Sequence, residues 1–328
     1  MLEGIAPSIA CPMGGGPSLN TDIGGIGVRT SFYLQTLLLA CLSARSGTLS
    51  EISGALYTLI ATNLALVVTS LILGLKSTPE ISFQDALVVF YLLHLSWTTI
   101  FFCLPACNRF AEDLKFLKLW SIVQSYMVFT FAFALLASAK SFGRSPGCNQ
   151  NAALVIFRPF PMFNAGLIVC WVLVVGVVSI YTLILVKEYI PPPPKRLRQL
   201  WKRTTRKPVD LVTPDPGVYS LTGVPQGSAI ETPEYPSKSG QQGRYRVHIA
   251  WDVMIELIVI TILWAICVMN TELLIRWNRF EASDASTSEW QFGQVLPMFL
   301  ITLPLVNVIG AFREFGIRPF PNSIQRRD

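Results

Sequence analysis

Three ionisable side chains recur at four-residue intervals at the start of an apolar segment. The stretch RVHIAWDVMIELIVI, residues 246–260, contains His248, Asp252 and Glu256. On a helix, residues spaced by four lie on one face. A stripe of this kind indicates a proton or cation relay if it is buried in a membrane. If it lies at the membrane surface, it indicates a hydrated helix end that pairs with basic residues, and this second interpretation is the more economical one.

The choice depends on where the hydrocarbon layer begins along this helix. If it begins at Ile249, Glu256 lies inside the layer, where a carboxylate costs about 2.5–3.5 kcal/mol. If it begins at Leu257, the span must extend further along the chain and takes in Asn270 and Glu272. Either one end of the helix is hydrated, or the helix is long and tilted.

A second histidine, His94, lies in the middle of the apolar segment YLLHLSWTTIF. An intramembrane histidine indicates a relay site, and the alternative is a neutral imidazole that is hydrogen-bonded to a neighbouring helix. No metal site is expected, because His248, Asp252 and Glu256 spread over two turns and do not converge on one point. Since no hydrolase, zinc-protease, Walker A or dinucleotide-binding motif occurs, we expect neither an enzyme nor a cofactor, and no nucleic-acid partner.

The elements that position these residues are apolar helices. Of the 328 residues, 52% are hydrophobic and only 14% are charged, whereas soluble domains carry about 25% charged residues. Charges are nearly absent from runs of about 20 residues, the length at which a helix crosses about 30 Å of hydrocarbon. The pattern predicts an all-α, seven-helix transmembrane bundle. The predicted spans lie near residues 23–44, 52–75, 82–104, 116–138, 164–186, 249–269 and 292–312.

Basic residues indicate the orientation of this bundle. With the N-terminus outside, the inner segments hold 19 of the 26 Lys and Arg residues, as expected for cytoplasmic loops. Without the longest loop the split is 8 to 7, which favours the same orientation only weakly. We therefore expect a multi-pass protein of the plasma membrane or another secretory-pathway membrane, with a cytoplasmic C-terminus. Its expected parts are an outer tail (1–22), helices one to five (23–186), a cytoplasmic loop (187–247), helices six and seven (248–312) and a cytoplasmic tail (313–328).

The long loop begins with the basic segment PPPPKRLRQLWKRTTRK. Its cations alternate with leucine and tryptophan, which predicts binding of anionic inner-leaflet lipid or a protein partner; a simple cytoplasmic anchor is the alternative. PPPPKR also fits the pattern that SH3 domains bind, although a proline stop after a span is the more economical explanation. The rest of the loop is rich in Pro, Gly and Ser, and we expect it to be disordered. The candidate binding residues are Lys195, Arg196, Arg198, Lys202 and Arg203.

Two cysteines, Cys11 and Cys148, fall on the predicted outer side, where disulfides persist. We therefore predict a disulfide between them. Near the outer end of the first span, Arg29 is expected to extend outward or to pair with Asp22 or Asp85. The glycines of DIGGIG are expected to allow close helix approach. Polar residues inside the spans, among them Gln35 and Asn63, are expected to join helices, and the prolines of the last span are expected to kink it.

The stretch DIGGIGVRTSFYLQTLLL, residues 22–39, resembles a group of uncharacterised fungal multi-pass membrane proteins that carry D-I-x-G-I-G-V-R before the first span. The layout is also similar to that of seven-helix receptors, although CNRFAED stands where those carry Asp/Glu-Arg-Tyr. We expect a receptor-like or regulatory membrane protein whose loop binds lipid or a signalling partner. The alternative is a channel or transporter that couples protons or cations through His94, His248, Asp252 or Glu256.

Overall fold

The structure is a computed structural model that describes residues 17–45, 49–107, 114–163, 165–189, 251–278, 280 and 292–315. The chain divides into two units, residues 1–179 together with 247–328, and residues 180–246. The second unit contributes the last part of one helix to the described residues. The packing described below is that of the first unit.

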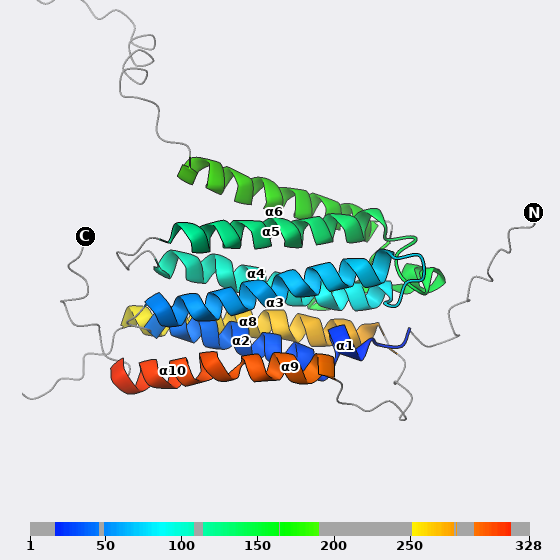
Figure 1. The fold of residues 1–328 in the computed structure, drawn as a ribbon. Coiled ribbons are helices and arrows are strands. Elements are labelled where there is room, and N and C mark those ends of the chain that lie inside the picture. Colours follow the sequence, from blue (N-terminus) through cyan, green and yellow to red (C-terminus); the bar gives the residue numbers. More distant parts are fainter. Residues whose placement is uncertain are drawn as a thin grey trace, which may run out of the picture. The chain divides into compact units, whose positions relative to one another are not determined.

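Among the described residues, six helical segments are long and apolar enough to cross a membrane. The chain is therefore an integral, multi-pass helical membrane protein. A short first helix, α1, and α2 together make the first of these segments (Figure 1). The helices are α1 (Thr21–Gly24), α2 (Ile26–Arg45), α3 (Leu49–Leu75), α4 (Phe83–Ala106), α5 (Lys115–Ala137), α6 (Ala165–Tyr189) and α8 (Trp251–Trp277).

A seventh apolar segment consists of two helices, α9 (Phe292–Leu300) and α10 (Thr302–Phe315). Pro297 and Pro304 have no N–H to donate, and the N–H of Ile301 donates to Met298, three residues back (3.3 Å). From α2, Gln35 Nε2 donates to the carbonyl of Pro297 (3.4 Å). A neighbouring helix thus satisfies backbone at the break, as membrane helices require. The expected kink is an interruption of the helix.

The central helix of the unit is α2, which packs against α3, α4, α8, α9 and α10 (Figure 1). Its polar residues Arg29, Gln35 and Arg45 are buried. At Gly27, a Cβ atom would lie only 2.7 Å from the Cβ of Gln294 in α9. The Gly27 N–H donates to Gln294 Oε1 (3.3 Å). The expected close helix approach is confirmed at Gly27, because only glycine leaves room for α9 here.

Buried apolar residues form two clusters, one toward each end of the bundle. The first surrounds Phe83, Phe131 and Phe142 at the end where α4 begins. The second lies where α3 begins and includes Leu39 and Leu56. Polar residues also join helices, as expected: the Ser96 hydroxyl of α4 donates to Asn63 Oδ1 of α3 (2.8 Å).

The start of α4 ties three segments together. Ser82 and Asp85 form a capping box, in which each side chain accepts a hydrogen bond from the backbone N–H of the other. The other carboxylate oxygen of Asp85 accepts from the backbone N–H of Asn20 (3.0 Å). Arg144, between α5 and α6, donates to Ser18 Oγ (2.6 Å). The N-terminal segment, the α3–α4 connection and the α5–α6 connection therefore meet at one end of the bundle.

A short hairpin between α5 and α6 departs from the all-α prediction. After the 3-10 helix η2 (Pro146–Asn151), β1 (Ala153–Ile156) pairs antiparallel with β2 (Arg158–Pro161). Phe157 makes the turn with φ 62°, a left-handed conformation that is uncommon for a bulky residue. Its backbone N–H donates to Asn270 Oδ1 (2.8 Å). The hairpin thus depends on a contact with α8, more than 100 residues away in the chain.

The end of α8 differs from the predicted sixth span, 249–269. Its candidate membrane segment is Leu257–Trp277. This matches the second of the two placements considered from sequence, because the segment takes in Asn270 and Glu272. The polar residues in this half of α8 anchor it to other elements.

Candidate functional site

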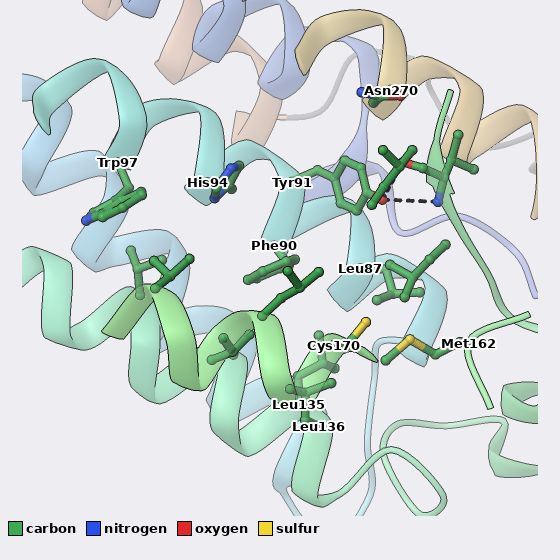
Figure 2. A pocket seen from close by; sticks show the side chains of 18 of the residues that line it. Leu87, Phe90, Tyr91, His94, Trp97, Leu135, Leu136, Met162, Cys170 and Asn270 are labelled. Carbon is green, nitrogen blue, oxygen red and sulfur yellow. Dashed lines mark hydrogen bonds between the residues drawn. The ribbon is translucent and has the colours of Figure 1, made fainter. Parts of the chain in front are cut away.

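A cavity of about 400 Å³ opens among α4, α5, the hairpin, α6 and α8 (Figure 2). Cavities of this size hold drug-sized molecules. Within the described part of the chain, no Asp, Glu, Lys or Arg lines it. We call it the aromatic pocket. Its lining residues are Leu87, Phe90, Tyr91, His94, Trp97, Val128, Phe129, Ala132, Leu135, Leu136, Leu154, Val155, Ile156, Phe160, Met162, Cys170, Leu173, Val174, Val177, Cys267 and Asn270.

One wall of the aromatic pocket is a row of rings on α4. Phe90, His94 and Trp97 follow the i, i+4, i+7 spacing that places residues on one helix face. The Phe90 and His94 rings have centroids 6.3 Å apart, and the His94 and Trp97 rings 5.9 Å apart, each pair inclined by 30°. Figure 2 shows these side chains along the same side of α4. Trp97 also meets Phe129 of α5 edge to face, at 5.5 Å. The result is a continuous row of aromatic rings along α4.

Polar contacts of the hairpin close one end of the aromatic pocket. The Tyr91 hydroxyl donates to the Val155 carbonyl (2.8 Å) and accepts from the Val155 N–H (3.1 Å). Directly after α8, Asn278 accepts from the Ala153 N–H (3.0 Å) and donates to the Ala153 carbonyl (2.9 Å). Together with the Asn270–Phe157 bond, these contacts fix β1 between α4 and α8. The end wall is therefore held by side chains rather than by strand pairing alone.

The aromatic pocket keeps hydrogen-bonding capacity at Asn270 and His94 that no other described residue uses. Asn270 uses Oδ1 for the hairpin, which leaves its Nδ2 free to donate. The His94 imidazole is flanked by two aromatic rings, and neither ring nitrogen bonds to another described residue. A neutral imidazole offers one donor and one acceptor. The site is thus apolar, with a neutral donor near the hairpin and a second polar group deeper along α4.

A charged cluster joins α2 to α8 outside the aromatic pocket. Arg29 pairs with Glu272, and the Tyr33 hydroxyl donates to the same carboxylate (2.8 Å). Trp264 Nε1 of α8 donates to the Tyr33 carbonyl (2.9 Å). The expectation that Arg29 extends outward or pairs with Asp22 or Asp85 is therefore wrong. Asp85 is buried and occupied by helix capping, whereas α8 brings Glu272 to Arg29.

The predicted relay of His94, His248, Asp252 and Glu256 stays a prediction, because three of its four side chains lie outside what the structure describes. Asp252 and Glu256 lie in the first two turns of α8, but their side chains are outside what the structure describes. His248 and the basic loop segment, with Lys195, Arg196, Arg198, Lys202 and Arg203, also lie outside the described residues. His94 lines the aromatic pocket among apolar side chains. The proton-coupled alternative therefore stays a prediction.

The cysteines separate into two kinds. Cys148, in η2, is disulfide-bonded, and none of the other described cysteines forms a disulfide. Cys11 lies outside the described residues, so its pairing with Cys148 stays a prediction. Cys170 of α6 and Cys267 of α8 face the aromatic pocket, where a thiol behaves as a small apolar group.

Sequence reasoning missed most of the site. From the sequence, Asn270 was relevant only to where the sixth span ends, although a polar residue inside a span is a signal of function or of a specific contact. The spacing of Phe90, His94 and Trp97 was a second signal, since it predicts a single aromatic face. No signal in the sequence identified the facing walls on α5, α6 and α8.

Comparison with known proteins identifies no family for this chain. The chain matches no protein-family model, and no curated protein or solved structure is significantly similar to it.

Proposed function

We propose that the chain is a receptor-like or regulatory membrane protein that binds an apolar ligand in the aromatic pocket. The proposal rests on one observation: α6 and α8 both line this pocket. Val174 and Val177 come from α6, and Cys267 and Asn270 from α8. These two helices precede and follow the long basic loop, 187–247. A ligand between them changes the preferred separation of the helices that carry the ends of that loop.

The loop provides the output in this proposal. Its basic segment suits anionic inner-leaflet lipid, at about 1 kcal/mol per Lys or Arg near the surface, or a signalling partner. Ligand binding that favours one separation of α6 and α8 shifts the population of loop states in proportion to its differential affinity for them. The described lining of the aromatic pocket contains no charged side chain. This absence of charge supports a regulatory protein over the alternative, a channel or transporter for protons or cations.

We further propose seven crossings, with the N-terminus outside and the C-terminus in the cytosol. Two observations support this. Both α9 and α10 pack along α2, so the interrupted seventh segment runs beside a full span. Cys148 is disulfide-bonded at the end of the bundle where the N-terminal segment lies, and disulfides persist on the oxidising side of a membrane. This agrees with the charge distribution of the loops.

The ligand-binding proposal is tested by filling the aromatic pocket. Val174→Trp adds bulk to its lining, whereas Val172→Trp makes the same change at an exposed position of α6 that does not line it. The full-length proteins are purified in mild detergent, and bound small molecules are counted by native mass spectrometry. We expect a retained apolar molecule in the wild type and in Val172→Trp, and none in Val174→Trp.

Coupling to the loop is measured on the same proteins in vesicles. Trypsin cleavage near Lys195–Arg203 is timed before and after the bound molecule is extracted. We expect extraction to change the cleavage rate severalfold in the wild type and in Val172→Trp, and to leave Val174→Trp unchanged. Equal rates in all three proteins, with and without ligand, would refute the regulatory role.

Orientation has its own test. In intact cells, we expect trypsin added outside to spare the loop and to cut it only after permeabilisation. Cleavage of the loop in sealed cells would reverse the proposed orientation.

A further inference from the structure

We propose that the ligand of the aromatic pocket is a sterol-type lipid, that is, a rigid planar polycyclic hydrocarbon with a single hydroxyl group. This inference rests on the ligand-binding part of the proposed function. It does not depend on coupling to the loop.

The polarity of the aromatic pocket selects an uncharged ligand. Its described lining holds no charged side chain, and Tyr91 is already bonded through its hydroxyl to β1. A carboxylate or phosphate placed there would be a buried charge that no Lys or Arg of the described lining offsets, which is strongly unfavourable. One neutral hydroxyl needs only one donor or acceptor, and Asn270 Nδ2 provides a donor.

The aromatic row of the α4 wall favours a rigid ligand. Phe90 stacks with His94 and His94 stacks with Trp97, each pair inclined by 30°, so the three rings form one continuous row along α4. A fused ring system lying against this row makes many simultaneous dispersion contacts. Because it has few rotatable bonds, it loses little conformational entropy on binding, whereas an acyl chain must be ordered along its length.

The position of Asn270 sets the orientation of this ligand. Asn270 lies beside the hairpin turn, since its Oδ1 accepts from Phe157, and the hairpin belongs to the end of the bundle that holds the N-terminal segment. The ligand hydroxyl therefore faces that end, where an amphiphile's polar group meets the membrane surface. The ring system lies along His94 and Trp97, and the hydrocarbon tail points deeper into the bilayer.

The test uses a photoactivatable cholesterol analogue and the full-length protein in phosphatidylcholine vesicles. Labelled peptides are mapped by mass spectrometry, and labelling is competed with cholesterol, with cholestane (the same ring system without the hydroxyl) and with oleic acid. We expect labelling of α4 and α6 peptides that line the aromatic pocket. We expect cholesterol to compete about tenfold better than cholestane, the effect of one hydrogen bond in a buried site, and oleic acid to compete least.

Asn270 of α8 and Asn278, directly after this helix, provide a matched pair of variants. Asn270→Leu removes the proposed hydroxyl partner, and Asn278→Leu removes a hairpin contact of the same kind outside the aromatic pocket. We expect Asn270→Leu to lose the preference for cholesterol over cholestane and Asn278→Leu to retain it. Val174→Trp should abolish labelling of the aromatic pocket, and Val172→Trp should preserve it.

The experiments distinguish a failure of the sterol assignment from a failure of the regulatory function. If oleic acid competes as well as cholesterol, or if Asn270→Leu keeps the preference for the hydroxyl, the sterol assignment is wrong while the aromatic pocket can still be a regulatory site. If cholesterol binds as described but the loop cleavage rate does not respond to it, the regulatory function is wrong and the sterol site stands.

Discussion

The helices α2 and α8 differ in how apolar they are and in how deeply they are buried in the bundle. Among the six candidate spans, the one that contains α2 is the least apolar and the most buried, whereas α8 is more apolar and mostly exposed. The buried polar residues of α2 face other helices, and the exposed isoleucines of α8 face the surroundings of the bundle. Since lipid tails solvate apolar side chains as well as a protein core does, helix association in a membrane relies on packing and polar contacts. In this pair of helices, the helix with the less apolar sequence is the more deeply buried one.

The pair that joins these two helices gives the largest expected effect. Arg29→Leu removes a cation whose side chain is only 11% exposed and leaves Glu272 without it. Breaking a fully buried pair on one side costs about 3–5 kcal/mol. Because the Glu272 side chain is 48% exposed, we expect a loss near the lower end of that range, about 3 kcal/mol, measured as thermal stability in detergent. The matched control is Lys76→Leu, which breaks the exposed Lys76–Glu80 pair and should cost less than about 1 kcal/mol. Equal losses would contradict the buried role of Arg29.

Leucine truncation compares the two helices directly. Leu39 of α2 is 1% exposed and Leu263 of α8 is 42% exposed. Leu39→Ala should cost about 2–5 kcal/mol, because it leaves a cavity among packed helices. Leu263→Ala should cost much less, because lipid can occupy the space. Thermal unfolding of both variants in the same detergent provides the measurement, and a larger loss for Leu263→Ala would reverse the proposed burial.

A smaller effect is expected at the contact of α2 with α9. Gly27→Ala places a Cβ against Gln294 and should cost about 1–3 kcal/mol by overpacking. Gly54→Ala on α3 is the control, because nothing lies within 4 Å of its added Cβ. That change should be neutral or stabilising by up to about 1 kcal/mol, since alanine favours a helix over glycine. If both variants unfold at the same temperature, α9 does not approach α2 as described.

The smallest effect concerns one hydrogen bond between the compared helices. Trp264→Phe removes the donor to the Tyr33 carbonyl and keeps most of the ring surface. Hydrogen bonds between membrane helices contribute about 0.6 kcal/mol on average. The control is Trp277→Phe, at an exposed ring near the end of α8, and it should have no measurable effect on the unfolding temperature. A loss as large as that of Gly27→Ala would mean that Trp264 has a further structural role.

Local patterns predicted most of the helices. Asn20 and Ser82 cap helices close to where the sequence places the first and third spans, because capping depends on residues within one turn. Contacts between distant residues were not predictable in this way. Arg29 has acidic residues nearby in the sequence, yet its partner Glu272 is 243 residues away. The hairpin turn at Phe157 likewise depends on Asn270, which no local rule connects to it.

The sequence by itself determined that this protein crosses a membrane, and it determined roughly where, because span length and charge content follow from the thickness and low polarity of the hydrocarbon layer. Only the tertiary structure decided which faces meet. The aromatic row on α4 becomes one wall of a cavity because α5, α6, α8 and the hairpin supply the other walls. The physical reason is that an apolar helix in lipid has no preferred side until polar contacts and close packing select its neighbours.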